Sequence, residues 1–364
     1  MKIVEIIPNL HSGGAEKFVV DLINELSERG NECSLVTLFE LSSDDFFYSF
    51  ISKKVNKQSL GKKMGFDIKC LYRLYRYVKK EKPDVVHAHI GSITYLILVV
   101  LLYRKCDYYA TIHSDAKLEA GGGIHKIIRK FLFKMNLVTP ITISEESEKS
   151  FDLFYGRTGN LIPNGCSEYQ PERIDSQHEL RKDVDFLFVH VASIQPVKNQ
   201  MTLLKAFKRL LDDGVRARLL LIGRNANEQI FNLLKPYFFD NIIYLGEQRN
   251  PRAFMSICDA FCLASLWEGM PISIIEAFSV GCIPITTPVG GCVNMIEDEV
   301  NGLLAEGTSV DAYYQVFKRF VKLESTQKEE LSKNAVNTFE QKYSINITAN
   351  KYIDLFANNH EFVN

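Results

Sequence analysis

The chain has 364 residues, of which 46% are hydrophobic, and its formal net charge is -1. This length is enough for two domains of ordinary size, each with its own hydrophobic core. A near-neutral chain carries no overall bias toward nucleic acid. The charge is nevertheless uneven, because residues 1–165 carry 23 Lys+Arg against 19 Asp+Glu, whereas the remainder carries 20 against 25.

The N-terminus, the apolar runs and the cysteines predict a cytoplasmic protein. The start, MKIVEIIPNL, has too short an apolar core for a secretory signal and contains Glu5. The longest apolar run, 93–103, falls short of the roughly 20 residues that span a bilayer. The eight cysteines include no CxxC pair, so we expect buried, reduced thiols.

The first half alternates apolar runs with amphipathic stretches, which is the pattern of a parallel sheet wrapped by helices. The expected strands are KIVEII (2–7), CSLVTLF (33–39), DVVHAH (84–89), DYYATIH (107–113) and LVTPITIS (137–144). The expected helices span about 17–29, 67–81, 93–103 and 124–135.

A polar segment, 166–185, has no apolar periodicity and is interpreted as an interdomain linker. A second alternation follows it, with expected strands at 186–193, 218–223, 242–246, 260–265 and 282–287, and helices at 199–211, 226–235, 251–257 and 272–280. We therefore predict two doubly wound, Rossmann-like α/β domains, 1–168 and 185–344, facing across a cleft. The informative residues should then follow the strands, because ligands bind beyond the carboxyl ends of parallel strands.

Two basic runs lie in the first domain. Lys53–Lys82 contains eleven basic and two acidic residues, and His125–Lys134 contains no acidic residue. Solvated helix faces would explain both runs. The alternative is a peripheral surface for anionic lipid or a phosphate-bearing acceptor, which two such runs in one domain favour.

Three residues follow strands in the first domain. Gly13 and Gly14, after 2–7, allow close backbone approach, and the next helix offers its N-terminal amides to an anion. A tight turn without a ligand is the simpler interpretation of this glycine pair. His113 ends the strand 107–113, where its position at the cleft favours a functional role over a surface one.

In the second domain, Lys198 follows the strand 186–193 and could reach a phosphate, although an exposed helix-start lysine has the same pattern. The segment SLWEGMPISIIEAF (265–278) is more informative. Its Gly269 and Pro271 predict a sharp turn with Pro271 at the first helical position. The following helix start suits a diphosphate, Glu276 could accept both hydroxyls of a ribose, and Glu268 could reach sugar hydroxyls.

Two further segments complete the candidates. PVGG (288–291) follows the strand 282–287 and offers another turn that suits an anion. Asp183 and Asp185 have the spacing of a metal-binding pair, but they precede a strand, and we expect no metal site there.

The segment SLWEGMPISIIEAFSVGCIPITTPVGG (265–291), with its E-x7-E arrangement, resembles the signature of retaining family 4 glycosyltransferases of the GT-B fold. Further matches occur in the family's order over almost the whole chain: GGAE (13–16), TIHS (111–114), IPNG (162–165), VASIQPVKN (191–199) and NGLL (301–304).

The resemblance implies that the second domain binds a nucleotide-diphosphate sugar and that the first binds the acceptor. Glu276 would hold the ribose, Lys198 the diphosphate and Glu268 the donor sugar, while Gly14 would lie near the diphosphate and His113 near the reacting carbon. The implied catalytic residues are His113, Lys198 and Glu268. The implied donor-binding residues are Gly13, Gly14, Ser193, Lys198, Gly223, Glu268, Gly269, Met270, Pro271 and Glu276.

The resemblance also implies metal-independent transfer without any cofactor. The departing phosphate oxygen would take the acceptor's proton, so that no enzyme base is needed. UDP is expected from its frequency in the family, and the segment 345–364 is expected to form a helix crossing back to the first domain.

The chain departs from the family pattern at three places. The strand 218–223 runs into Arg224 and Asn225 without a second glycine. Ser193 stands near the place of an arginine that would pair with the diphosphate, and Arg224 or Arg249 would have to replace that charge. Asn294 stands near the place of a glutamate, so one donor contact loses its charge.

The predicted function is transfer of a hexosyl or N-acetylhexosaminyl group to a glycan or polyprenol-linked acceptor in bacterial surface polysaccharide synthesis. The expected site is the cytoplasmic face of the membrane. Two other functions fit the same residues: a non-catalytic subunit that binds a nucleotide sugar for a partner glycosyltransferase, and a sugar-nucleotide epimerase or phosphorylase on the same fold. A transferase needs acceptor for rapid nucleotide release, whereas an epimerase does not.

Overall fold

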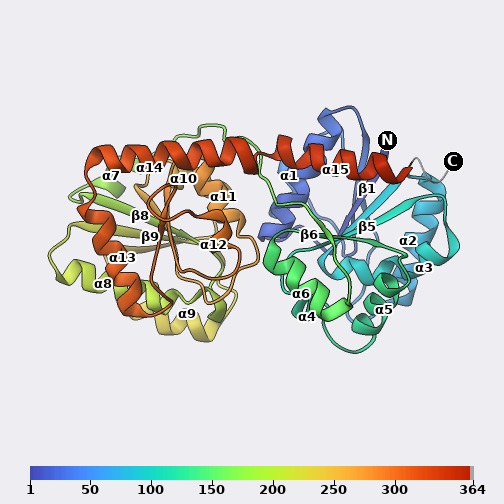
Figure 1. The fold of residues 1–364 in the computed structure, drawn as a ribbon, viewed down its shortest axis with the longest axis horizontal. Coiled ribbons are helices and arrows are strands. Elements are labelled where there is room, and N and C mark those ends of the chain that lie inside the picture. The colour runs from blue at the N-terminus through green and yellow to red at the C-terminus, as the bar shows by residue number, and fades with distance from the viewer. Residues whose placement is uncertain (361–364) are drawn as a thin grey trace. The chain divides into compact units, whose positions relative to one another are not determined.

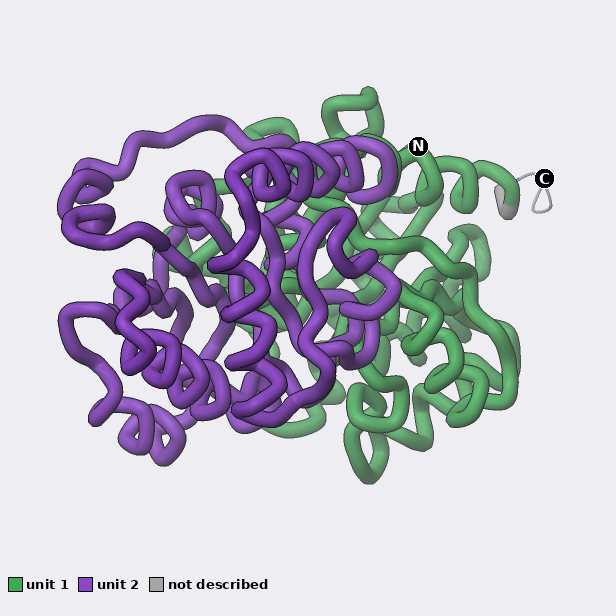
Figure 2. The backbone as a smooth tube through the Cα atoms, turned by 60° about the vertical axis from the view of Figure 1, so that its left-hand side comes forward, with its two compact units in different colours: residues 1–167, 344–364 green, residues 168–343 purple. Residues whose placement is uncertain are grey.

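The computed structural model describes the backbone of residues 1–360 and the side chains of residues 1–358. The chain forms two compact units (Figure 2). Unit 1 comprises residues 1–167 and the C-terminal segment that starts at Ser344, and unit 2 comprises residues 168–343. Among the described residues, no helix combines the length and apolar character needed to cross a membrane.

Unit 1 is built on a seven-stranded parallel sheet with the order β3-β2-β1-β4-β5-β6-β7. Its strands are β1 (Lys2–Ile7), β2 (Glu32–Thr37), β3 (Asn56–Ser59), β4 (Val85–His89), β5 (Asp107–Ile112), β6 (Thr139–Thr142) and β7 (Asn160–Leu161). The order reverses between β1 and β4, which are paired with Glu5 opposite His87. Ligands of doubly wound folds bind at such a reversal, beyond the carboxyl ends of the strands.

The helices of unit 1 cover both faces of this sheet. They are α1 (Gly14–Glu28), α2 (Ile68–Glu81), α3 (Ile97–Leu102), α4 (Ala116–Glu119), α5 (Gly123–Lys134), α6 (Glu145–Tyr155) and α15 (Ile345–His360), with 3-10 turns η1 (Tyr48–Phe50) and η2 (Ile90–Leu96). Figure 1 shows part of this sheet, with α15 on one side and α5 and α6 on the other. Alternate strand residues such as Val86 and Ala88 form one core with α2, α3, α5 and α6. The opposite side chains face α1 and α15, where the ring of His87 lies 5.3 Å from that of Tyr352.

Unit 2 contains a six-stranded parallel sheet with the order β10-β9-β8-β11-β12-β13. Its strands are β8 (Phe186–Val191), β9 (Ala217–Ile222), β10 (Ile242–Gly246), β11 (Ala260–Leu263), β12 (Ile283–Thr286) and β13 (Leu303–Leu304). Its helical elements are α7 (Gln177–Arg181), η3 (Pro196–Lys198), α8 (Gln200–Asp212), α9 (Glu228–Leu234), η4 (Lys235–Tyr237), α10 (Pro251–Met255), α11 (Ile272–Ser279), α12 (Cys292–Met295), α13 (Val310–Lys322), α14 (Ser325–Thr338) and the π-turn η5 (Phe339–Tyr343). The order reverses between β8 and β11.

The predicted fold class is confirmed, with all predicted strands present and parallel. Several boundaries differ from the expectation. The first helix begins at Gly14 rather than near Lys17, and the run 93–103 is a 3-10 turn followed by the short helix α3. The polar segment 166–185 contains the helix α7, and the short strands β3, β7 and β13 were not predicted. These short elements pair at or near sheet edges, where an apolar pattern is not required.

Candidate functional site

The loops after β8 and β11 in unit 2 bring Lys198 and Glu268 together. The Nζ of Lys198 lies 2.7 Å and 2.9 Å from the two carboxylate oxygens of Glu268. The hydroxyl of Ser265 also donates to Glu268, whose side chain is only 7% exposed. A buried carboxylate needs such partners, because an unpaired buried charge is strongly unfavourable. The Lys198 side chain remains 21% exposed, so its ammonium group can still approach a ligand.

The turn that carries Glu268 is joined to the loop of Lys198 through the backbone. The amide of Leu266 donates to the carbonyl of Val197 over 2.8 Å. The helix α11 follows this turn and begins at Ile272, which corrects the predicted position of Pro271: it caps the helix with an extended backbone instead of occupying the first helical position. Glu276 is buried in α11, one turn beyond the start of the helix.

The PVGG turn after β12 packs directly on the turn that carries Glu268. The amide of Gly291 donates to the carbonyl of Glu268 over 3.1 Å. A Cβ atom on Gly290 would lie 1.8 Å from that carbonyl oxygen, and one on Gly291 would lie 1.9 Å from the carbonyl oxygen of Gly269. Only glycine permits this backbone approach, and Gly290 also has a left-handed φ of +48°.

The loop after β8 packs against the end of β9 in the same manner. Gly223 has a φ of +145°, and a Cβ atom there would lie 2.1 Å from the carbonyl oxygen of Ala192. Ser193, which follows Ala192, accepts two hydrogen bonds. Its hydroxyl accepts from the side chain of Gln195, and its carbonyl accepts from the side chain of Gln200. Ser193 and Gly223 are therefore neighbours in a rigid loop pair at the carboxyl edge of the sheet.

The remaining predicted residues of unit 2 have different environments. Met270 is buried in the turn before α11. Asn294 is exposed on the short helix α12, and the two arginines considered as replacements for a missing phosphate-binding charge, Arg224 and Arg249, are also exposed.

In unit 1, the loop after β1 leads through Gly13 into α1. Gly13 has an extended backbone, with a φ of -176°, and caps the helix, while Gly14 is its first residue. A Cβ atom on Gly13 would meet only the flexible end of the Glu16 side chain. The strict need for glycine that marks Gly290 is thus absent at Gly13.

His113 follows β5 directly and is partly buried. Its Nε2 lies 2.9 Å from Nδ1 of His89, at the end of β4. The Nε2 of His89 lies 2.7 Å from the carboxylate of Glu5, on β1, which His87 also contacts over 2.9 Å. Glu5, His87 and His89 are fully buried. They were not predicted as site residues, although the spacing of His87 and His89 in a buried strand places both on one face of the sheet.

The ionisation of this cluster follows from its surroundings. Burial opposes ionisation of Glu5, but the two histidines outweigh it and lower the pKa of its carboxyl group to about 2. Burial lowers the pKa of His89 to about 4, with a further contribution from His87. Burial also lowers the pKa of His113, well below its usual value. The cluster therefore combines an ionised Glu5 with neutral His89 and His113 near pH 7.

The backbone of His113 is held by a second buried carboxylate. Glu119 accepts hydrogen bonds from the amides of His113 and Ser114, over 2.8 Å and 3.1 Å. Burial raises the pKa of Glu119, and Arg129 on α5 lies 3.6 Å from it. Arg129 is itself buried and donates to the carbonyl of Ile90 over 2.5 Å.

Two family models match the chain in succession. The model described as Glycosyltransferase Family 4 matches residues 12–167, and the model described as Glycosyl transferases group 1 matches residues 171–338. The chain is a GT-B glycosyltransferase of group 1. The two matches together span most of both units.

Two relatives of this glycosyltransferase are named for acceptors linked to undecaprenol. The chain is 25% identical to UDP-Gal:alpha-D-GlcNAc-diphosphoundecaprenol alpha-1,3-galactosyltransferase of Escherichia coli, covering 80% of this chain and 81% of that one. It is 23% identical to GalNAc-alpha-(1->4)-GalNAc-alpha-(1->3)-diNAcBac-PP-undecaprenol alpha-1,4-N-acetyl-D-galactosaminyltransferase of Campylobacter jejuni, over 84% of each.

Solved structures share the fold of this glycosyltransferase. Anabaena Alr3699/HepE in complex with UDP-glucose superposes with a TM-score of 0.81 and 17% identity, covering 98% of this chain and all of that one. Sucrose-phosphate synthase from Thermosynechococcus elongatus gives a TM-score of 0.79 with 18% identity, covering 98% of this chain and 99% of that one. At this identity, the likeness establishes the GT-B fold alone.

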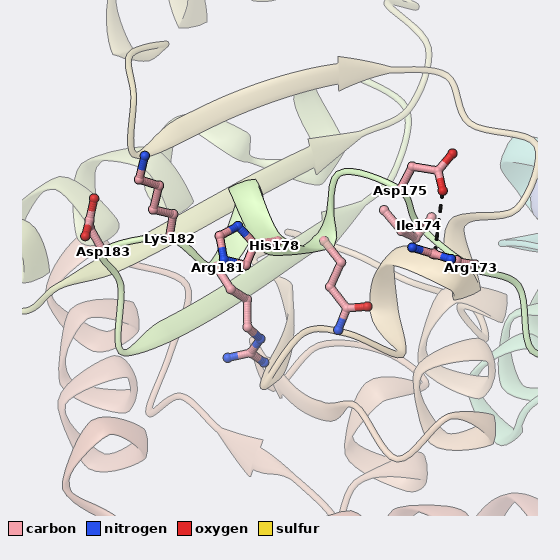
Figure 3. Close-up of a pocket in the computed structure, with 8 residues that line it drawn as sticks. Arg173, Ile174, Asp175, His178, Arg181, Lys182 and Asp183 are labelled. Carbon is pink, nitrogen blue, oxygen red and sulfur yellow. Dashed lines mark ion pairs between the residues drawn. The ribbon is translucent and has the colours of Figure 1, made fainter.

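The glycosyltransferase also has a surface pocket in unit 2. It is lined by residues of the segment before β8, which include His178, Arg181 and Asp183 (Figure 3). Its ion pair between Arg173 and Asp175 is almost fully exposed. None of the predicted donor-binding residues lines this pocket, and it carries no functional assignment.

Proposed function

We propose that this glycosyltransferase binds a nucleotide-diphosphate sugar through unit 2 and transfers the sugar, with retention of configuration, to a lipid-linked glycan. The main support is the Lys198–Glu268 pair, built between the reversal-point loops after β8 and β11. Enzymes of this fold bind ligands at such loops. UDP is the proposed nucleotide, since one relative uses UDP-Gal and HepE binds UDP-glucose.

Lys198 is proposed to bind the diphosphate. An ammonium group has three donors, and two of those of Lys198 are engaged by Glu268. Its partly exposed position leaves it able to donate to a phosphate oxygen as well. When the bond between the sugar and the phosphate breaks, the same charge would stabilise the leaving diphosphate.

The two glutamates are proposed to bind the sugars of the donor. Glu268 has carboxylate oxygens at the turn between β11 and α11, where they can accept hydrogen bonds from hydroxyls of the transferred sugar. Glu276, one turn into α11, can accept both hydroxyls of a ribose. The intervening Gly269, Met270 and Pro271 would place the α11 N-terminus against the diphosphate.

We propose that the turns that require glycine allow the donor to contact the protein backbone. The PVGG turn and the Ser193–Gly223 loop pair lie beyond the carboxyl ends of β12, β8 and β9, where glycine lets the backbone segments approach closely. Amides in such turns can donate to phosphate oxygens. Together with the α11 N-terminus and Lys198, these amides of unit 2 would supply the positive potential that a metal ion provides in other transferases, so transfer is proposed to be metal-independent.

The acceptor is proposed to be a polyprenol-linked glycan at the membrane surface. The two basic runs of unit 1 meet, because the ring of Phe66 lies 5.7 Å from that of His125. Large apolar side chains are exposed on both: Met64 and Ile68 at 90% and 71%, and Ile127 at 66%. Exposed apolar side chains among lysines are typical of a surface that lies in the membrane interface. We name this surface the basic apolar face; it comprises residues 62–72 and 124–135.

Product formation tests the enzymatic proposal. The wild type would be incubated with a panel of UDP-, GDP- and ADP-sugars, with or without a polyprenol-diphosphate-linked N-acetylhexosamine acceptor, in the presence of EDTA. We expect acceptor-dependent release of UDP and a product whose anomeric proton has the coupling constant of the donor. Rapid release without acceptor would favour an epimerase or hydrolase, and no release with any donor would favour the binding-subunit function.

Flotation with liposomes tests the membrane proposal. We expect the wild type to bind vesicles containing anionic phospholipid at low salt and to bind weakly at high salt. Ile127→Asp should abolish most of this binding, whereas Leu233→Asp, at an apolar position of unit 2 that is 60% exposed, should not. Equal binding by both variants and the wild type would reject the basic apolar face as the contact surface.

A further inference from the structure

A buried chain of three side chains ends at His113. It runs from the carboxylate of Glu5 through the ring of His89 to the ring of His113, with links of 2.7 Å and 2.9 Å. Each residue comes from a different strand or strand end: β1, β4 and the end of β5. Such a polar chain in the centre of a sheet is costly unless every member is satisfied.

We propose that Glu5 and His89 are positioning residues that fix His113 in a single tautomer, with the hydrogen on Nε2 and the lone pair on Nδ1. This proposal rests on the proposed function and on the expectation, drawn from the family resemblance, that His113 lies near the reacting carbon of the donor sugar. The inference concerns which nitrogen of His113 can donate to that sugar and which can accept.

The direction of each hydrogen bond follows from the ionised carboxylate of Glu5 at the buried end. An ionised carboxylate can only accept, so Nε2 of His89 must donate to Glu5. The neutral His89 ring then carries no hydrogen on Nδ1, and that nitrogen must accept from Nε2 of His113. The neutral ring of His113 therefore keeps its lone pair on Nδ1. Among the described residues, no hydrogen bond engages that nitrogen from within the protein.

The backbone clamp at Glu119 strengthens this arrangement. Glu119 holds the amides of His113 and Ser114, so the ring is anchored at the main chain as well as at Nε2. The ring also packs edge-on against Phe18 of α1, with 5.9 Å between the centroids. With its orientation restrained from these sides, Nδ1 can present a fixed acceptor to a sugar hydroxyl.

A metal ion is the alternative interpretation of part of this cluster. One ligand atom from each of Glu5, His87 and His89 lies within 4.8 Å of the others, which is close enough for a metal site. Nitrogen and oxygen ligands of a tetrahedral zinc ion are about 3.3 Å apart, however. The carboxylate of Glu5 lies only 2.7 Å and 2.9 Å from the two rings, which are hydrogen-bond lengths. The geometry thus favours hydrogen bonds over coordination.

The test is nitrogen NMR of the histidine rings in the full chain, labelled with ¹⁵N-histidine and free of substrate. Long-range proton–nitrogen correlations distinguish the two neutral tautomers, and His113→Ala identifies the signals of that ring. We expect His113 to show the Nε2-protonated pattern in the wild type. In Glu5→Gln, whose amide can donate as well as accept, and in His89→Phe, which keeps the ring without its nitrogens, we expect a mixed or inverted pattern.

A matched control is Tyr109→Phe. Tyr109 lies on β5, is fully buried and donates from its hydroxyl to the carbonyl of Leu355. It takes no part in the hydrogen bonds that link Glu5, His89 and His113. Removing that hydroxyl should leave the His113 signals unchanged. With the preferred donor, Glu5→Gln should lower kcat by about 10- to 100-fold, as expected for loss of a group that orients a site residue. The donor KM should change little.

Three results would overturn the inference: an Nδ1-protonated His113 in the wild type, unchanged His113 signals in both Glu5→Gln and His89→Phe, or stoichiometric zinc in the purified protein. The tautomer of His113 is measured without substrate. An unexpected tautomer would therefore reject this inference without rejecting the proposed function. An inactive wild type with the expected tautomer would reject the transferase role alone.

Discussion

The centres of the two sheets differ, although their strand orders correspond. In unit 1 the central strands β1 and β4 carry Glu5, His87 and His89, all fully buried. In unit 2 the corresponding strands β8 and β11 carry mainly apolar side chains, and the buried His190 is satisfied by the carbonyl of Cys262 over 2.8 Å. The polar residues of unit 2 lie in the loops beyond the strands instead.

This difference separates two ways of building a site on one fold. In unit 2, loops held by close glycine contacts carry the charged residues, so the sheet remains an ordinary hydrophobic core. In unit 1, the residue that reaches the surface, His113, depends on polar side chains inside the core. Changes of the charged side chains in the unit 2 loops should therefore affect activity more than stability, whereas changes in the unit 1 centre should affect both.

The largest expected effect is the loss of activity in Lys198→Ala. Removing the proposed phosphate contact should lower kcat by about 10²- to 10³-fold, as for other groups that stabilise developing negative charge. Steady-state kinetics with the preferred donor measures this. Lys205→Ala, at an exposed position of α8, is the control and should retain full activity. A loss below tenfold in Lys198→Ala would remove Lys198 from the proposed site.

Acid pH should destabilise both units. Burial lowers the pKa of His89 and of His190 from 6.5 to about 4. Between pH 6.5 and 4, these histidines are protonated in the unfolded chain, whereas the buried rings of the native protein stay neutral. The stability that the neutral rings contribute is therefore complete above pH 6.5 and is lost as the pH falls toward 4. The resulting decrease in the free energy of unfolding approaches about 3 kcal/mol for each ring.

Urea unfolding at several pH values between 7 and 4.5 measures this loss. His178→Gln should leave the pH dependence unchanged, because that ring is 91% exposed. His190→Gln should make it shallower. A wild type whose free energy of unfolding is constant over this range would contradict the assignment of two neutral buried rings.

A smaller effect is expected for Gly290→Ala. The new Cβ atom would lie 1.8 Å from the carbonyl oxygen of Glu268, at a left-handed φ, so the turn must shift. We expect a destabilisation of about 1–3 kcal/mol by thermal or chemical unfolding, and reduced activity, because the shift displaces Glu268. In Gly307→Ala, where the nearest side chain is 3.9 Å from the added Cβ atom, both quantities should stay close to wild type.

The smallest predicted effect concerns the C-terminal helix of unit 1. Arg29, the C-cap of α1, donates to the carbonyl of Asn346 over 2.9 Å and to the side chains of Asn346 and Asn350, and thus ties α1 to α15. These contacts are exposed to solvent, so Arg29→Ala should lower the free energy of unfolding by only about 0.5–1.5 kcal/mol. Activity should be unchanged. A substantial loss of activity at unchanged stability would show that α15 has a role beyond packing.

The sequence predicts some parts of this molecule better than others, for physical reasons. Long apolar runs such as 186–193 and 260–265 identify the central strands, because a strand covered on both faces must be apolar. The same rule concealed Glu5 and His87, since a polar residue inside such a strand gives no sign of its partner across the sheet. Edge strands such as β3 lack an apolar pattern and were missed.

The residues of the candidate site also divide into those that the sequence predicts and those that it does not. Lys198, Glu268 and the PVGG turn were predicted from their positions after strands, and the structure brings them together. The contact of His113 with His89 depends on the register of β4 and β5, which a single sequence does not reveal. Pro271 was predicted one residue too far into its helix, a displacement typical of helix ends.

The most direct measurement is thermal stability with a panel of nucleoside diphosphates, made on the wild type and on Glu276→Ala. A nucleotide present at about 100 times its dissociation constant should stabilise the native protein by about 2.7 kcal/mol. We predict that UDP raises the melting temperature of the wild type and that Glu276→Ala loses most of this increase. The proposed donor site would be contradicted if no nucleotide stabilised the wild type, or if Glu276→Ala retained the full increase.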